Sequence, residues 1–387
     1  MYRKTQTIKK CFLFNLIFHK GIRVSLFDGI TIKIKSINDF YGYAIKKAHS
    51  TPFMKNELAF GQMTLNIEED IHHLIFEYLK LPTNSSKDEI LELYNKELSK
   101  RELIELNYLV HRRIVDKIPV AYLTSKAYYQ GESLYVNKDT LIPRSYIGEI
   151  LSYVHKNEKT SSSISGGGDG GATKEDPALF HTPSIKSVLD LCCGSGCLAI
   201  LASRIFSNAK EIHASDISPV ALNVALKNVK SKSLSQSIQL FEGDLFNALP
   251  SGSRYDMILC NPPYVNTSAL KTLPGEYKVE PKLALFAENR GLGIILRILK
   301  EASNYLTLPS KEEVVNHKLY MENVNQNGGI LILEIGSNKN DLLHLIPSLK
   351  KYAIWLETSQ SIDEVFLLSH KNLVKLGYSL NKIENKL

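Results

Sequence analysis

Six short apolar runs in the second half of the chain constrain its fold more than any other feature. From residue 185 onward they alternate with stretches that have helical spacing, notably 218–230, 291–306 and 340–350. Such alternation favours an open, mostly parallel sheet with helices on both faces. The runs occupy residues 188–192, 211–216, 238–242, 256–260, 330–335 and 365–369. We therefore predict an α/β fold whose ligands bind at the carboxyl ends of the strands.

The first three runs each end in residues suited to binding a nucleoside. After the first, Gly194 and Gly196 let the backbone turn sharply and approach a ligand at the start of the next helix. The second ends in Asp216, where a carboxylate can accept hydrogen bonds from both ribose hydroxyl groups. The third ends E-G-D-L-F and places Asp244 and Leu245 beside the base. These positions together predict a cofactor site.

S-adenosylmethionine fits this pattern better than a dinucleotide does. A nicotinamide enzyme would carry a fuller G-x-G-x-x-G, whereas Cys197 and Ala199 follow the two glycines here. Asp190 lies inside the first strand and precedes the glycine loop, which is typical of S-adenosylmethionine binding. That cofactor has no pyrophosphate to cradle, and its ammonium group suits acidic or carbonyl groups.

The fourth run ends D-M-I-L-C-N-P-P-Y (256–264), the most specific motif in the chain. Two prolines fix the backbone and remove two N–H donors, leaving carbonyl groups, the Asn261 amide and the Tyr264 ring. A planar –NH₂ group suits such a site, with the Asn261 side-chain oxygen and the Pro262 carbonyl accepting its two N–H bonds. An amide nitrogen is a weak nucleophile, because its lone pair is conjugated with the carbonyl. Positioning can contribute on the order of 7–11 kcal/mol toward its reaction. The predicted catalytic and substrate-binding residues are Asn261, Pro262, Pro263 and Tyr264.

Three motifs together resemble the HemK/Prm family of protein-glutamine methyltransferases. L-D-x-C-x-G-S-G-C-x-A-I (189–200), D-I-S-P-x-A-L (216–222) and N-P-P-Y-V (261–265) have that family's order and spacing. The stretches 112–127, 141–149 and 273–281 are similar to the branch that methylates a glutamine in the third protein of the large ribosomal subunit. The resemblance runs from about residue 36 to 375, apart from insertions near 156–184 and 308–326.

The resemblance implies a Rossmann-like methyltransferase domain with a mostly parallel seven-stranded sheet. It also implies that Asn261 to Tyr264 hold the target glutamine. One departure is E-N-R-G-L at 288–292, where Arg290 replaces an acid of the family motif G-x-D-G-L. The cofactor contacts that it implies are Cys192, Cys193, Gly194, Ser195, Gly196, Asp216, Leu245 and Asn261.

The rest of the chain divides by composition. We predict that residues 36–118 form a small helical domain that recognises the substrate. Apolar residues recur there at helical spacing, for example from Ile67 to Leu79. Residues 119–142 predict a linking β-hairpin. Within the methyltransferase domain, 143–387, we expect Pro143 to open a helix that runs through Val154. A Ser/Gly-rich insertion at 158–177 is expected to be disordered.

The net charge of +7 lies entirely in residues 1–35. That segment has eight basic side chains and one acid, which leaves 39 of each in residues 36–387. A basic leader with the apolar run 11–18 is typical of an organelle presequence; the alternative is a basic arm on a cytoplasmic protein. The apolar run is too short to span a bilayer. We expect no membrane span, and the five cysteines do not have the spacing of a metal site.

Two other targets share the predicted chemistry. A peptide chain release factor would offer the same glutamine amide. An adenine amine of DNA is likewise planar and conjugated, but an enzyme acting on it must grip and flip the base. The neutral body gives no broad basic face for nucleic acid, so we expect a protein substrate and no direct nucleic-acid readout. A scaffold that only binds the cofactor is disfavoured, because Asn261 is intact.

Overall fold

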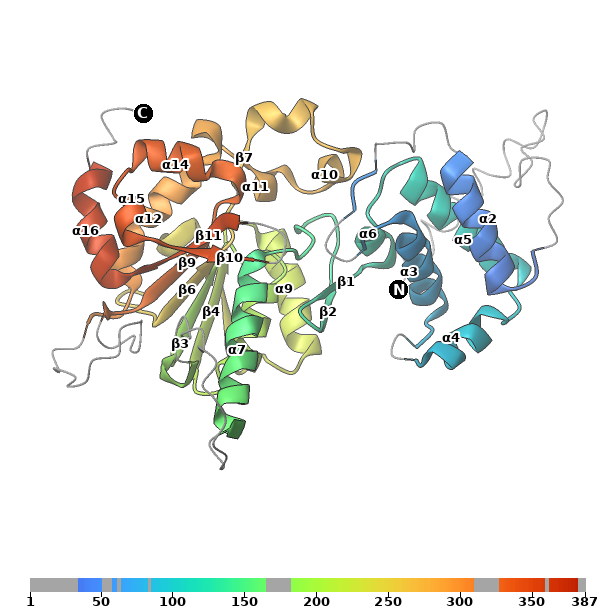
Figure 1. Cartoon of the computed structure of the whole chain (residues 1–387), viewed down its shortest axis with the longest axis horizontal. Helices are drawn as coiled ribbons and strands as arrows, with labels where there is room; N and C mark the ends of the chain where they lie inside the picture. Colours follow the sequence, from blue (N-terminus) through green and yellow to red (C-terminus); the bar gives the residue numbers. More distant parts are fainter. Residues whose placement is uncertain are drawn as a thin grey trace.

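The computed structural model describes residues 34–50, 58–60, 64–82, 85–164, 182–309, 327–358 and 362–381. Almost all of the predicted leader, most of the Ser/Gly-rich insertion and most of the second insertion lie outside these ranges. The described chain forms a helical domain and an α/β domain joined by a hairpin (Figure 1).

The helical domain packs its helices around an apolar core of its own. Leu74 and Val110 are fully buried in that core. Ser86 and Ser99 each form a capping box with the glutamate three residues later, which fixes the start of the helix that follows. The helices are α2 (Ile37–Ser50), α3 (Ile67–Leu79), α4 (Lys87–Tyr94) and α5 (Lys100–Ile114).

The link between the domains is a short helix, α6 (Val120–Thr124), followed by a two-stranded hairpin. Strands β1 (Lys126–Tyr129) and β2 (Glu132–Tyr135) pair antiparallel, as the sequence predicted. Gln130 and Gly131 form the turn, with φ of 48° and 82°. Positive φ at both turn residues matches the right-handed twist of a hairpin and favours glycine at the second.

A seven-stranded sheet forms the centre of the α/β domain (Figure 1). Its order is β10-β11-β9-β6-β3-β4-β5, and β11 alone runs antiparallel to the other six strands. The mostly parallel sheet of the prediction is therefore confirmed. The strands are β3 (Ser187–Leu191), β4 (Glu211–Asp216), β5 (Ile238–Glu242), β6 (Met257–Cys260), β9 (Ile330–Glu334), β10 (Ile354–Glu357) and β11 (Ile362–Ser369).

Helices cover both faces of this sheet, so its central strands are buried throughout. Val188 and Leu189 are neighbours on β3 but belong to two different apolar cores, one on each side. On one side lie α7 (Tyr146–Ile164), α8 (Cys197–Ile205) and α9 (Pro219–Ser231). On the other lie α12 (Gly293–Tyr305), α14 (Lys339–Leu345), α15 (Leu349–Tyr352) and α16 (His370–Asn381). Within the described ranges no helix has the length and apolarity that a bilayer crossing needs.

The carboxyl edge of the sheet carries several shorter elements. They include the strands β7 (Val265–Asn266) and β8 (Phe286–Ala287), which pair with each other. The helices α10 (Gly275–Val279) and α11 (Lys282–Leu285) lie between them in sequence.

Two predicted helix boundaries were wrong. Helix α7 begins at Tyr146, not Pro143, because the Ser145 hydroxyl accepts a hydrogen bond from the backbone N–H of Ile147 at 3.2 Å. It continues to Ile164, into the stretch predicted as a disordered insertion. No glycine or proline interrupts the chain between Tyr146 and that point except Gly148 in the first turn, so nothing local ends the helix earlier.

Candidate functional site

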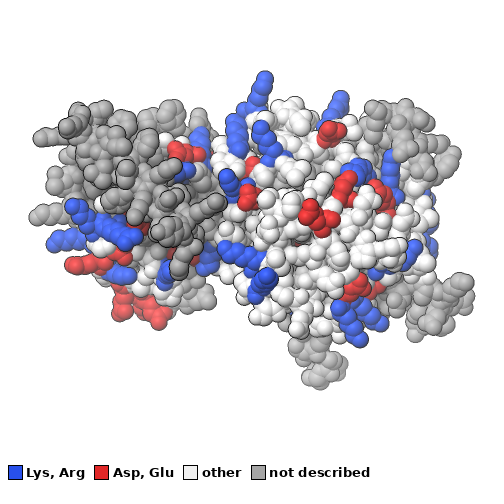
Figure 2. Space-filling model, turned by 180° about the vertical axis from the view of Figure 1, so that it is seen from behind, with Lys and Arg blue, Asp and Glu red and all other residues white. Residues whose placement is uncertain are grey.

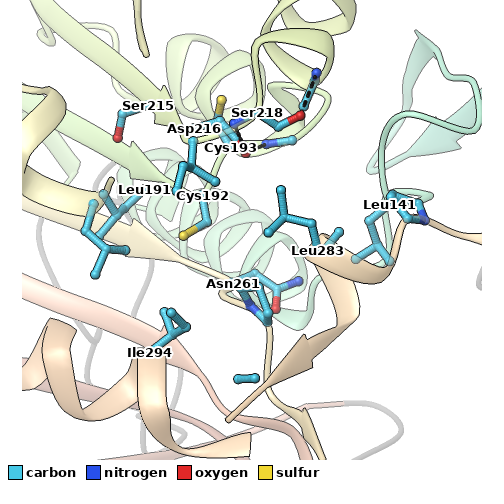
Figure 3. A pocket seen from close by; sticks show the side chains of 18 of the residues that line it. Leu141, Leu191, Cys192, Cys193, Ser215, Asp216, Ser218, Asn261, Leu283 and Ile294 are labelled. Atoms are coloured by element: carbon cyan, nitrogen blue, oxygen red, sulfur yellow. Dashed lines mark hydrogen bonds between the residues drawn. The ribbon is translucent and has the colours of Figure 1, made fainter. Parts of the chain in front are cut away.

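The carboxyl ends of β3, β4, β5 and β6 surround a cavity of about 600 Å³. Figure 3 shows Cys192, Asp216 and Asn261 around this space, from the β3–α8 loop and the ends of β4 and β6. Of the predicted site residues, Gly196, Pro262 and Tyr264 do not line it. Those that do are Asp190, Cys192, Cys193, Gly194, Ser195, Asp216, Asp244, Leu245, Asn261 and Pro263.

The loop between β3 and α8 depends on left-handed backbone at three positions. Cys192, Gly194 and Gly196 have φ of 62°, 52° and 76°. A Cβ atom on Gly194 would meet nothing within 4 Å, whereas one on Gly196 would lie 3.3 Å from the Cβ of Ala225. Cys192 adopts this conformation without being glycine, which costs about 1–2 kcal/mol. The loop thereby brings its backbone to the edge of the cavity.

Asp216 holds this loop in place from the next strand. Its carboxylate accepts hydrogen bonds from the backbone N–H groups of Gly194 at 2.8 Å and Ser218 at 2.9 Å. Burial raises the pKa of Asp216, and these hydrogen bonds partly offset that rise. The backbone N–H of Ile217 also acts on this group, and a carboxylate has about four acceptor positions, so at least one remains for a hydroxyl group of a ligand.

The other two predicted acids have structural partners as well. Asp190 is buried and accepts a hydrogen bond from the backbone N–H of Ala199 at 2.9 Å, which ties β3 to the first turn of α8. Burial raises the pKa of Asp190 to about 7, against the effect of that hydrogen bond. Asp244 makes a two-pronged ion pair with Arg297 of α12, at 3.1 and 2.7 Å. Leu245, after Asp244, is buried with φ of 50°.

Asn261 lies directly after β6 and borders two cavities. One is the cavity described above, and the other has a volume of about 530 Å³. Its Oδ1 atom is buried and accepts no hydrogen bond from any described residue. A buried acceptor without a partner carries a free-energy penalty, which a donor on a ligand would remove.

Tyr264 reaches away from the first cavity and anchors the N-P-P-Y loop. Its hydroxyl donates a hydrogen bond to Glu334 at 3.0 Å, and its backbone carbonyl accepts one from the Asn338 side chain at 2.8 Å. The ring packs on Gly336, where a Cβ would lie 2.6 Å from ring carbon Cε2. Tyr264, Pro262 and Asn261 all line the second cavity.

Glu334, at the end of β9, is a site residue that sequence reasoning missed. It also accepts hydrogen bonds from the Ser145 hydroxyl at 2.6 Å and the Tyr146 backbone N–H at 2.9 Å. Its side chain is buried, and burial raises its pKa to about 7. The signal was present, because Glu334 is an acid at the end of an apolar run, as Asp216 is.

Both domains supply walls of the second cavity. Phe60, Thr64 and Leu65 come from the helical domain, whereas Tyr277 and Ala284 come from the segment after β7. The three family-like stretches meet beside it. Arg113 pairs with Glu276 at 2.7 Å, and Arg144 pairs with Glu280 at 2.5 Å. Arg290, the departure from the family motif, is exposed with φ of 59° and lines neither cavity.

Comparison with known proteins agrees with this geometry. The protein-family model described as the methyltransferase small domain matches residues 178–276, which include β3 to β6. Three proteins described as ribosomal protein uL3 glutamine methyltransferase are similar over most of the chain. That of Burkholderia pseudomallei is 33% identical, over 88% of this chain and 96% of its own. Those of Bradyrhizobium diazoefficiens and Neisseria meningitidis are each 34% identical, over 88% and 90% of this chain and 92% and 98% of their own.

Proposed function

This chain belongs to the family of ribosomal protein uL3 glutamine methyltransferases, and we propose that it methylates the side-chain amide nitrogen of a glutamine in ribosomal protein uL3 with S-adenosylmethionine as methyl donor. The observation that carries the proposal is the buried, unpartnered Oδ1 of Asn261, where the two cavities adjoin. The –NH₂ group of a glutamine is the donor that this atom lacks. The first cavity then takes the cofactor and the second takes the substrate.

The residues around the first cavity fit S-adenosylmethionine. Its volume lies within the roughly 300–1,000 Å³ typical of small-molecule sites. Asp216 keeps acceptor capacity for a ribose hydroxyl, and Gly194 leaves open space beside the loop. We assign Asp190 to holding this loop, since its carboxyl group is bonded to α8. When bound, the cofactor supplies a methyl group on a positively charged sulfur.

The chain's own residues orient the substrate nitrogen. Asn261 Oδ1 and the Pro262 carbonyl accept its two N–H bonds and direct the nitrogen toward the cofactor cavity. Tyr264 and Glu334 fix the loop that carries both acceptors. No strong base is needed, because the nitrogen's extra proton becomes acidic once the nitrogen is alkylated. Positioning of this kind can contribute on the order of 7–11 kcal/mol.

The ribosomal protein is favoured over the other targets. Relatives with 30–34% identity over about nine-tenths of the chain carry the uL3 description. On the face shown in Figure 2, Lys and Arg side chains are scattered among acidic and neutral ones and form no single basic patch. This distribution gives no support to DNA as the substrate, because a DNA-binding protein needs a broad basic face.

The test offers labelled S-adenosylmethionine with uL3, a release factor and DNA as separate substrates. We expect label on the glutamine of uL3. Asn261→Ala should still bind the cofactor, with turnover reduced about 100-fold or more, the loss typical of a preorganised polar group. Asn208→Ala, at an exposed position away from both cavities, is the matched control. Label on DNA alone, or full turnover by the Asn261 variant, would contradict the proposal.

We also retain the organelle presequence as a proposal for residues 1–35, on their charge and apolar run. Residues 1–33 lie outside the described residues. N-terminal sequencing of the protein isolated from its own cells tests it: an N-terminus beyond residue 30 supports a removed leader, and an intact one contradicts it.

A further inference from the structure

The second cavity combines apolar walls with acidic groups. Leu65 of the helical domain lines it with 71% of its surface exposed, and the rings of Tyr146 and Tyr277 line it as well. Two carboxyl groups, from Glu334 and Glu364, belong to the same lining. Such walls suit a side chain with an apolar stem and a polar end.

The charges of this cavity do not balance. Among the described residues of its lining, Arg144 alone is basic, and the buried Glu280 already pairs with it at 2.5 Å. Glu334 is committed to its three hydrogen bonds and has a raised pKa. Among the described residues none pairs with the carboxylate of Glu364. Within the described part of the chain, the carboxylate of Glu364 therefore borders this cavity without a counter-charge.

Glu364 lies close to the residues that hold the catalytic loop. Glu364 belongs to β11 and lies beside the end of β9, because its backbone carbonyl accepts a hydrogen bond from the Ile335 backbone N–H at 2.8 Å. Its charge also acts on Tyr146 and Tyr264 and contributes to their raised pKa values, for which burial is the larger cause. A residue near the target glutamine in the substrate would meet this carboxylate.

We propose that Glu364 binds a lysine or arginine side chain that flanks the target glutamine, so that the second cavity selects a basic loop of the substrate. The inference rests on the proposed function and specifies its substrate. The aliphatic stem of the basic residue packs against Tyr146 and Tyr277, and its charged end forms a charge-assisted hydrogen bond with Glu364. A protein that binds ribosomal RNA is rich in such basic segments. A substrate loop with no basic residue beside the glutamine could not make this contact with Glu364.

The experiment compares wild type and Glu364→Gln on uL3 at several salt concentrations. We expect the KM for uL3 to rise about tenfold in the variant, with kcat changed less than twofold and a weaker dependence of KM on salt. Glu357→Gln changes an exposed glutamate of β10 in the same way and serves as the control, with KM unchanged. An unchanged KM in Glu364→Gln would overturn the inference.

Variants of the substrate complete the test and need no change in the enzyme. Replacing the basic residues that flank the glutamine by methionine should raise the KM of the wild type about tenfold but scarcely affect that of Glu364→Gln. Equal losses for both enzymes, or none for the wild type, would overturn the inference. Failure of the wild type to methylate uL3 at all would overturn the proposed function itself, whereas methylation that is indifferent to the flanking charge overturns only the role of Glu364.

Discussion

Glu334 shows how one buried carboxyl group can serve a site and reduce stability at the same time. One oxygen accepts hydrogen bonds from Ser145 and the Tyr146 backbone, and the other accepts one from Tyr264. Burial nevertheless raises its pKa from 4.5 to about 7. In the unfolded chain the group loses its proton near pH 4.5, so the folded state binds more protons between these two values. The free energy of unfolding must therefore fall, through this group, as pH rises from about 4.5 to 7.

Glu334→Gln should remove that pH dependence and keep the contacts. The amide oxygen can accept from Ser145 and Tyr146, while the amide N–H donates to the Tyr264 hydroxyl oxygen. Urea unfolding at pH 5, 6, 7 and 8 should show a smaller decline for the variant than for the wild type. Glu334→Ala instead leaves buried donors unpaired and should lose about 1–3 kcal/mol at every pH, with lower turnover. Parallel pH profiles for wild type and Glu334→Gln would contradict this account.

The residues of the site differ in how far the sequence could predict them. The position of Asn261 to Tyr264 beside the cavities was predictable because they form one contiguous motif at the end of a strand, while their catalytic role stays a prediction. The place of Glu334 at the end of an apolar run was visible in the sequence, but its partners, 70 and 189 residues away, were not. Asp190 was predicted as a cofactor contact, but its carboxyl group turned out to be bonded to the first turn of α8, which depends on the shape of the folded loop.

At the scale of elements, apolar patterning predicted the buried strands well. Strands β4 and β5 have the bounds that their runs predicted. Strand β10 was missed, because it has only four residues and lies at the edge of the sheet, with Leu356 alone among them buried. The helix predicted over 340–350 is two helices, α14 and α15, with Pro347 between them. Short edge strands and breaks of this kind carry little periodic signal.

The turn after β9 offers a prediction at this scale. Gly336 has φ of 54°, and a Cβ there would lie 2.6 Å from the Tyr264 ring. Gly336→Ala must therefore displace the ring and the loop that carries Asn261. We expect turnover to fall at least tenfold and the free energy of unfolding by about 1–3 kcal/mol, with cofactor affinity retained.

A glycine with free space around it gives the matched control. Gly377 lies within α16, and a Cβ there would meet nothing within 4 Å. Gly377→Ala should leave turnover unchanged and add roughly 0.5–1 kcal/mol of stability, because alanine favours the helix. Isothermal titration with the cofactor, turnover assays and urea unfolding check both variants. Normal turnover in Gly336→Ala would show that the Tyr264 ring can move without effect on the site.

At the scale of the whole molecule, the two domains meet at a buried charge cluster. Arg113 of α5 is 2% exposed and pairs with Asp70 of α3 and Glu276 of α10. Thr64, which lines the second cavity, donates a hydrogen bond to the same Asp70 at 2.7 Å. The contact between Arg113 and Glu276 spans 163 residues, so no local pattern could predict it. The cluster sets where the helical domain places its wall of the cavity.

Arg113→Met should therefore weaken both the fold and the binding of substrate. It leaves two buried carboxylates without their counter-charge, which typically costs 3–5 kcal/mol. Urea unfolding should show that loss, and the KM for uL3 should rise while the affinity for cofactor stays the same, because the first cavity does not include Arg113. Arg101→Met removes an arginine whose side chain is 81% exposed and should leave the free energy of unfolding almost unchanged.

A triple variant separates loss of charge balance from loss of the arginine itself. Adding Asp70→Asn and Glu276→Gln to Arg113→Met removes the uncompensated charges, so part of the lost free energy of unfolding should return. The KM for uL3 should stay high, because the guanidinium group of Arg113, which linked α5 to α3 and α10, is still missing. A triple variant as unstable as Arg113→Met would mean that packing of the arginine, with its contact to Phe60, matters more than its charge. A normal KM in Arg113→Met would mean instead that the helical domain does not need this cluster to form its wall of the cavity.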